Sequence, residues 1–219
     1  MFSFRESALQ AINDAKSIMD SIREFSPMLA EKAESILSRA KEEYKVEEYL
    51  LAKCYARKVY EMREKINPVG IVIDGYSEDW TERYEPLTVD KSGDIPNEGQ
   101  DVASVYVVND QNNLYLMFEF GGEPKAGVAL WFDTNSDELW DYHVKCIAEK
   151  AFVGKMIKPD YCEITSNLQY AYGHVIEVSV PLDLIGQPST ARMQIASWDE
   201  KRKQLDKVDN FNWVTYELS

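Results

Sequence analysis

The spacing of apolar residues along this chain changes once, near residue 68. Before that point apolar positions recur every three or four residues, as in Leu9, Ile12 and Met19, which is the period of an amphipathic helix. After it, short runs of β-branched and aromatic residues alternate with turn clusters such as 109–113, a pattern typical of antiparallel strands. The pattern therefore predicts a helical region followed by a β region.

The helical region divides at two joints. Ser26 and Pro27 suit the N-cap and the first position of a second helix, and a third helix is expected over about 47–65, before Asn67 and Pro68. Short joints favour antiparallel neighbours, so we expect a three-helix bundle over residues 1–67 that acts as a spacer or docking element. The residues expected to face inward in the third helix are Leu50, Cys54, Ala56, Val59 and Tyr60.

The β region contains many short strands without long helices between them. This arrangement indicates an antiparallel sandwich or barrel. The expected strands lie at 71–73, 102–108, 114–120, 128–132, 142–148, 151–155, 175–180 and 193–198. The fold class predicted for the whole chain is thus α+β and multidomain: a helical bundle at 1–67, then a β-sandwich of immunoglobulin-like or jelly-roll type at 69–219.

Charge separates the same two regions. Residues 1–67 carry 12 Lys and Arg against 12 Asp and Glu, whereas residues 68–219 carry 12 against 26, which accounts for the net charge of −14. An acidic region repels nucleic-acid phosphates but tolerates calcium or a sugar. Because the chain has neither 18 consecutive apolar residues nor a signal-peptide pattern, we expect no membrane insertion. It is expected to be either cytoplasmic or one piece of a longer protein.

The three cysteines, Cys54, Cys146 and Cys162, do not form a disulfide framework or a metal-binding pattern. Free buried thiols are the expectation. A bond between Cys146 and Cys162 on neighbouring strands is the alternative.

Four ordered matches give the β region a family resemblance. It resembles the family 9 carbohydrate-binding modules and their DOMON-like relatives over about residues 71–219. The matching segments are IVIDG at 71–75 with DW at 79–80, VYVVND at 105–110 with LYL at 114–116, VALWF at 128–132 closing on Asp133, and GHVIEVSVP at 173–181.

The resemblance implies a site in which two Trp rings hold a sugar. An aromatic ring stacks on the apolar face of a pyranose, while carboxylates and amides bind its hydroxyls. The loop at 121–127, where the family carries its first Trp, has no aromatic residue, and Ala129 stands where the family has a sugar-contacting Glu. Trp213, preceded by Asn210, matches the second Trp.

Other aromatic residues are candidates to complete such a site: Trp131, Trp140, Tyr142 and Trp198. Trp140 lies in an acidic loop, and alternation places Trp131 on the strand face opposite Leu130 and Phe132. Trp80 is expected to pack beneath the first turn. The predicted ligand-binding residues are Trp140, Trp213, Asn210 and Trp131.

Calcium is the one metal that the sequence suggests. The spacing of Asp133, Asn135 and Asp137 superficially matches the start of an EF-hand loop, although Glu138 occupies the place of the required Gly. Members of the resembled family carry structural calcium, so a structural calcium at these three residues is the prediction. An acidic turn without metal is the alternative.

No catalytic motif stands out in the sequence, so we expect no enzyme. The leading hypothesis is a non-catalytic, carbohydrate-binding module from a larger extracellular or cell-surface protein, with polysaccharide or glycan as ligand. The alternative is an interaction or spacer module without a small ligand. A third hypothesis is a haem-bearing electron-transfer domain of the DOMON type, with Met117 and His174 as ligands.

Overall fold

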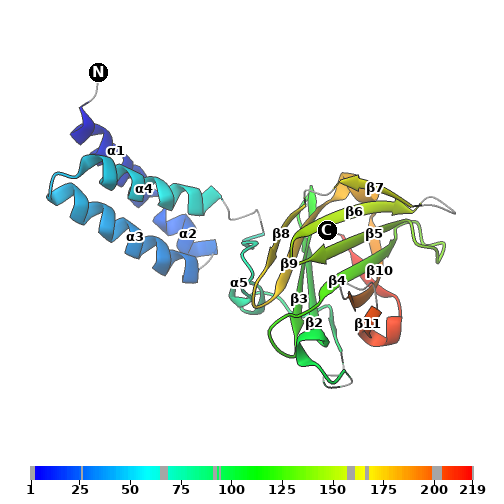
Figure 1. Cartoon of the computed structure of the whole chain (residues 1–219). Coiled ribbons are helices and arrows are strands. Elements are labelled where there is room, and N and C mark those ends of the chain that lie inside the picture. Colours follow the sequence, from blue (N-terminus) through cyan, green and yellow to red (C-terminus); the bar gives the residue numbers. More distant parts are fainter. Residues whose placement is uncertain are drawn as a thin grey trace. The chain divides into compact units, whose positions relative to one another are not determined.

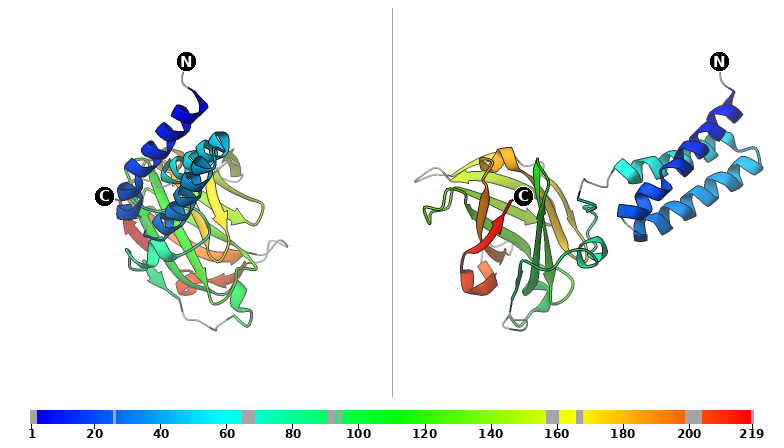
Figure 2. Two further views of the ribbon diagram at one scale, coloured as in Figure 1. Left: turned by 90° about the vertical axis from the view of Figure 1, so that its left-hand side faces the viewer. Right: turned by 180° about the vertical axis from the view of Figure 1, so that it is seen from behind.

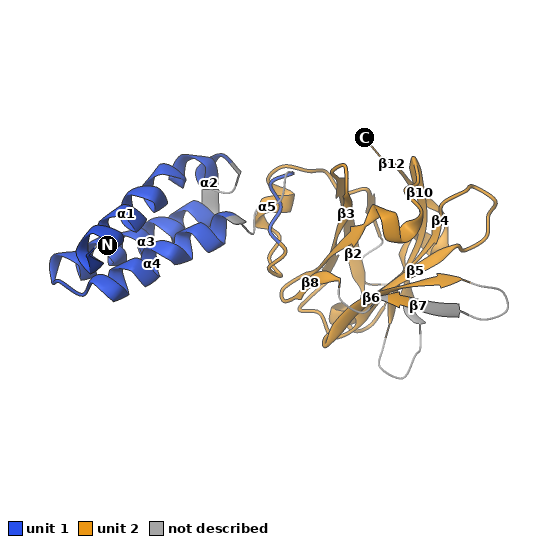
Figure 3. Cartoon of the chain, turned by 90° about the horizontal axis from the view of Figure 1, so that it is seen from above, with its two compact units in different colours: residues 1–72 blue, residues 73–219 orange. Residues whose placement is uncertain are grey.

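The computed structural model describes residues 3–25, 27–64, 69–90, 93, 95–156, 161–165, 168–198 and 204–218. The chain divides into two compact units, residues 1–72 and residues 73–219 (Figure 3). The first is helical and the second consists of antiparallel sheets, so the chain has an α+β fold with helices first and strands second, as the change of period predicts.

The helical unit consists of α1 (Phe4–Ser17), α2 (Met19–Phe25), α3 (Pro27–Lys45) and α4 (Tyr49–Glu64) (Figure 1). Ser3 begins α1 with a capping box to Glu6. The first predicted helix is interrupted at Ile18, whose N–H bonds to the carbonyl of Lys16 in a tightened turn. The helix α3 begins at Pro27 as expected, and Ser26 lies outside the described residues.

Small side chains line the contacts between these helices. The helix α4 packs against both α1 and α3, and fully buried alanines let the backbones approach closely. They are Ala8, Ala15, Ala33, Ala40, Ala52 and Ala56.

The inward face of α4 differs in part from the prediction. Ala52, Ala56 and Val59 are buried, whereas Leu50 is 61% exposed. Cys54 and Tyr60 are also exposed. These three expectations are wrong because the buried stripe follows the small residues that fit between α1 and α3, rather than the larger apolar side chains.

The β unit contains two antiparallel sheets. The first has the strand order β1 (Thr88–Val89), β2 (Val102–Asn109), β3 (Asn113–Phe120), β9 (Ile176–Pro181) and β8 (Gln169–Tyr172). The second has the order β11 (Gln204–Lys207), β10 (Thr190–Trp198), β4 (Gly127–Asp133), β5 (Tyr142–Ile147), β6 (Lys150–Met156) and β7 (Tyr161–Thr165), and β12 (Val214–Glu217) also pairs with β10.

Short helical turns link the strands: α5 (Glu78–Thr81), η1 (Glu98–Gln100), η2 (Leu182–Ile185) and η3 (Val208–Phe211). The predicted strand at 71–73 is wrong, since these residues join no sheet. The two sheets face one another (Figure 2) and share one apolar core, to which β3 contributes Leu116 and Phe118 and β4 contributes Leu130 and Phe132. Among the described helices, none is long and apolar enough to span a bilayer.

Candidate functional site

On the outward face of the second sheet, residues that pair between neighbouring strands form rows that run across the strands. Leu130 and Phe132 point into the core and are fully buried, so Trp131, which alternation places on the opposite face, points outward. Trp131 pairs with Gln194 on β10 and with His143 on β5. In the next row Ala129 lies between Ala196 and Lys145.

Four aromatic side chains gather on this face, and we call Trp131, Trp140, Trp198 and Phe211 the aromatic cluster. The Trp131 ring centroid lies 5.6 Å from that of Trp140, 6.1 Å from that of Trp198 and 5.3 Å from that of Phe211. Trp140 and Phe211 are 6.3 Å apart. Trp140 is 39% exposed, so the cluster presents an aromatic surface to solvent.

Two alanines explain how these large rings fit on one sheet. Trp131 and Trp198 stand on opposite sides of the row that contains Ala129 and Ala196, yet their rings are 6.1 Å apart. Both indoles must therefore lean over that row, where both alanines are fully buried. A Glu in place of Ala129 would occupy the space that the rings fill, so the small side chain at this position is what allows the cluster to form.

Trp140 is positioned by a loop that folds around one carboxylate. The buried Asp133 accepts hydrogen bonds from the backbone N–H groups of Asn135, Asp137 and Glu138, at 3.3, 3.3 and 3.0 Å. Arg192 donates a further bond to Asp133 at 2.9 Å. Asp141, at the end of the loop, accepts bonds from the backbone and hydroxyl of Thr134. The loop that carries Trp140 is thus held at both ends.

Gln194 joins the two segments that bring Trp140 and Phe211 to the sheet. Its Oε1 accepts a bond from the Trp140 indole at 2.7 Å, and its Nε2 donates to the Phe211 carbonyl at 2.8 Å. Phe211 ends η3, where Asp209, Asn210 and Phe211 all have positive φ. Because non-glycine residues adopt this conformation at a cost, the glutamine bridge helps to fix the turn.

The predicted ligand residues therefore fall into two groups. Trp131 and Trp140 belong to the aromatic cluster, and the exposed Asn210 directly precedes its member Phe211. Trp213 instead lies under the Arg192 guanidinium, 5.0 Å from its ring centroid. Arg192 also binds Asp133, so Trp213 is linked to the Trp140 loop through that arginine.

The carboxylate of Asp133 is already well supplied with donors, which bears on the calcium prediction. Its oxygens receive three backbone N–H groups, and its charge is balanced by Arg192. A calcium ion needs six to eight oxygen ligands at 2.3–2.6 Å and would compete with these donors. Among the described residues no group of three or more His, Cys, Asp and Glu side chains converges as a metal site would require. Calcium would have to displace these donors from Asp133, and calcium at Asp133, Asn135 and Asp137 stays a prediction.

Lysines border the aromatic cluster. Lys145 Nζ lies 4.3 Å from the ring centroid of Trp198, and Lys207 Nζ lies 5.7 Å from that of Phe211. A groove of about 380 Å³ adjoins Trp198 and is also lined by Lys125, Glu149 and residues of the β4 and β5 ends.

His143 lies beneath this surface. It is buried, with its ring 5.9 Å from that of Phe152. Burial, with a smaller contribution from the charge of Lys145, lowers the pKa of His143 to about 4. The imidazole is therefore neutral at physiological pH, and it adds no charge to the face.

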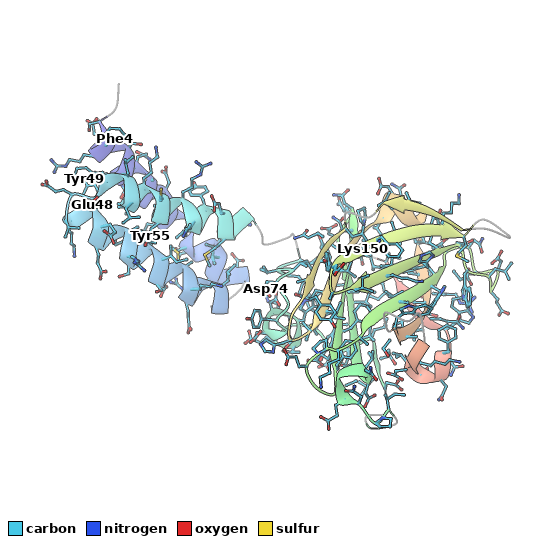
Figure 4. All side chains as sticks on the ribbon, viewed as in Figure 1. Phe4, Glu48, Tyr49, Tyr55, Asp74 and Lys150 are labelled. Carbon is cyan, nitrogen blue, oxygen red and sulfur yellow. The ribbon has the colours of Figure 1, made fainter. Side chains whose placement is uncertain are left out.

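The residues that carry the family resemblance near 71–80 and 173–181 lie apart from this site. Trp80 is fully buried and donates its indole N–H to Glu177, which also accepts bonds from the backbone N–H groups of Asp74 and Gly75. Asp74 is labelled in Figure 4. Glu177 therefore fixes the segment that leads into the first sheet.

The two residues considered for haem differ in their surroundings. Met117 is fully buried on β3, whereas His174 is exposed and stacks against Tyr76 at 5.2 Å. Haem binding through Met117 and His174 stays a prediction.

Two members of the site were missed from sequence: Phe211 and Gln194. Trp198 was among the candidate aromatic residues but not among the predicted ligand-binding residues. Gln194 could have been found, because it lies on an expected strand with the same outward alternation as Trp198. Phe211 could not, since its place depends on the η3 turn and not on strand period. Comparisons with models of protein families, with curated proteins and with solved structures gave no match for this chain.

Proposed function

We propose that residues 69–219 form a non-catalytic carbohydrate-binding module, a β-sandwich of immunoglobulin-like or jelly-roll type within a larger extracellular or cell-surface protein. Its ligand is a polysaccharide or glycan that binds over the aromatic cluster. The helical region at 1–67 serves as the spacer or docking element of that larger protein.

The observation that carries this proposal is the aromatic cluster on the outward face of a sheet. Sugar rings have apolar faces that pack on aromatic rings, while their hydroxyls need nearby donors and acceptors. Trp140 supplies the most exposed ring, and Gln194, Asn210 and Lys145 supply polar groups around the cluster. Three indoles and a phenyl ring would otherwise be a costly group to leave partly in water.

The hydrogen bonds that fix the Trp140 loop also support glycan binding. Trp140 is held by Gln194, and its loop is held by Asp133 and Asp141. A ring that is positioned before the ligand arrives loses less conformational entropy on binding. An aromatic surface of this kind is thus suited to a stiff, extended ligand such as a polysaccharide chain.

Binding to a panel of soluble polysaccharides tests the proposal, by affinity gel electrophoresis followed by titration calorimetry on any positive. We expect Trp140→Ala to weaken binding about tenfold or more, as buried aromatic anchors do at interfaces. Leu139→Ala is the matched control, because Leu139 is the adjacent, similarly exposed apolar residue of the same loop, and it should leave affinity within about twofold.

Absence of binding by the wild-type protein to every glycan would overturn the proposal and favour the alternative, an interaction or spacer module without a small ligand. Binding that survives both Trp140→Ala and Trp131→Ala would place the glycan elsewhere. A Soret band after addition of haem would favour the third hypothesis, electron transfer through Met117 and His174.

A further inference from the structure

Positive charge gathers on the sheet face that carries the aromatic cluster, although residues 68–219 as a whole hold 12 Lys and Arg against 26 Asp and Glu. By alternation, the outward positions of β4, β5 and β10 carry Lys145 and Arg192 against a single carboxylate, Asp133. The next strand, β11, adds Lys207, paired with Ala196. On these strand positions the sign of charge is therefore opposite to that of the region, whereas the adjoining loop that carries Trp140 holds Asp137, Glu138 and Asp141.

Lys145 and Lys207 lie in the same row of paired residues across the sheet. Lys207, Ala196, Ala129 and Lys145 follow one another across four strands, so the two lysines flank the two alanines over which Trp131 and Trp198 lean. The same row continues to Phe152, over which Lys150 lies at 5.0 Å (Lys150 is labelled in Figure 4).

The aromatic rings also restrict where the ammonium groups lie. The Lys145 ammonium lies 4.3 Å from the Trp198 centroid, within the range of a cation–π contact. A lysine that lies on a ring has already lost part of its rotamer freedom, so an ion pair with a ligand costs it less conformational entropy. Anionic groups on the two sides of the cluster would each meet one such lysine, Lys145 on one side or Lys207 on the other.

We infer that the glycan bound by this face is anionic, with carboxylate or sulfate groups that pair with Lys145 and Lys207 while a sugar ring stacks on Trp140. This inference rests on the proposed glycan binding. A neutral glycan would use the rings and hydrogen bonds to its hydroxyls, and would gain nothing from the charge of the lysines. An anionic glycan gains from both, and the strongly acidic remainder of the region disfavours its binding elsewhere.

Affinity measurements on the full chain with three kinds of polymer test the inference. They are polygalacturonate for carboxylate, chondroitin sulfate for sulfate, and the methyl-esterified, uncharged form of polygalacturonate. We expect a charged polymer to bind and its affinity to fall as salt is raised from 20 to 500 mM, because the Debye length shortens from roughly 20 to roughly 4 Å. The uncharged form should bind more weakly.

The double variant Lys145→Gln/Lys207→Gln should lose about tenfold in affinity for the charged polymer at low salt and little for neutral glycans. The matched control is Lys41→Gln/Lys45→Gln, which changes the net charge equally within α3 and should leave binding unchanged. Equal loss in both double variants would overturn the inference, since only overall charge would then matter.

The remaining outcomes separate this inference from the function on which it rests. Binding to neutral glycans that depends on Trp140 but not on Lys145 and Lys207 overturns the inference and leaves the proposed function intact. Failure of all charged and neutral glycans to bind overturns both. Binding to only one of polygalacturonate and chondroitin sulfate supports the inference and identifies the anionic group.

Discussion

The indole N–H of Trp80 donates a hydrogen bond of 2.6 Å to Glu177 inside the β unit. Both side chains are fully buried. The second carboxylate oxygen accepts bonds from the backbone N–H groups of Asp74 and Gly75. One carboxylate on β9 therefore holds both the backbone of the entering segment and the helix α5, which contains Trp80.

Glu177 makes the stability of the β unit depend on pH. Burial raises the pKa of Glu177 from 4.5 to about 8, against the opposing effect of its N–H donors. Because the folded-state pKa lies above the unfolded one, the folded state binds the extra proton between pH 4.5 and 8, and its stability falls as pH rises through that range. We expect a decrease of a few kcal/mol, since each unit of pKa difference corresponds to about 1.4 kcal/mol.

Urea denaturation followed by Trp fluorescence between pH 5 and pH 9 measures this effect. The control is Glu177→Gln, which cannot ionise and should show a flatter dependence than the wild type, whatever its absolute stability. A wild-type stability that is constant or rises with pH relative to Glu177→Gln would show that the carboxylate is ionised throughout, held so by its three donors.

The cysteines differ in reactivity because they differ in exposure. Cys146 is a free, buried thiol of the core, and burial raises its pKa, whereas Cys54 is exposed on α4. Since the thiolate is the reactive form, iodoacetamide should modify Cys54 in the native protein and leave Cys146 unmodified until urea is added. Peptide mapping by mass spectrometry measures the extent of alkylation at each cysteine separately.

Modification of Cys146 in the native protein would contradict this prediction. The alternative disulfide assumed neighbouring strands, which is wrong: Cys146 lies on β5 and Cys162 on β7, with β6 between them. A peptide joining the two cysteines would contradict this strand order. The side chain of Cys162 lies outside the described residues.

The period of the sequence predicts most of the fold. The strands at 102–108, 114–120 and 128–132 are found within one residue at each end as β2, β3 and β4, because each has a fully apolar side that must be buried. The strands β1, β7, β8, β11 and β12 were missed. Each has two to five residues and packs at or near a sheet edge, so it carries too little alternation to be recognised.

Strand alternation predicts only those residues of the site that lie on strands. That rule places Trp131 on the face opposite Leu130 and Phe132, and it would have placed Gln194 beside it, on the same face as the candidate Trp198. The position of Trp140 depends on the way Asp133 caps its loop, and that of Phe211 depends on three consecutive residues with positive φ. These features depend on tertiary contacts. The sequence therefore predicts Trp140 as a ligand-binding residue without indicating which residues it contacts.

Gly127 begins β4 at a point where the backbone admits no side chain. A Cβ there would lie 2.3 Å from the carbonyl oxygen of Cys146 and 2.9 Å from Ile147. Because the nearest obstacle is backbone, Gly127→Ala should destabilise the β unit by about 1–3 kcal/mol. Gly121→Ala is the matched control, since its nearest contact is at 3.4 Å, and it should cost less than about 1 kcal/mol. Equal midpoints of urea denaturation for the two variants would contradict the prediction.

Asp133→Ala tests the support of the Trp140 loop. The change removes the acceptor of three backbone N–H groups and leaves Arg192, with its side chain 20% exposed, without its ion-pair partner. We expect a loss of about 2–4 kcal/mol in the free energy of unfolding, together with a red shift of Trp fluorescence as Trp140 leaves Gln194.

Asp137→Ala is the control within the same loop, since Asp137 accepts a single bond from the Leu139 N–H, and it should cost less than about 1 kcal/mol. If the loop instead bound calcium, added calcium would raise the melting temperature of the wild type, and both variants would abolish that rise. A stability insensitive to calcium, with a large effect of Asp133→Ala alone, would show that hydrogen bonds to this one carboxylate order the loop.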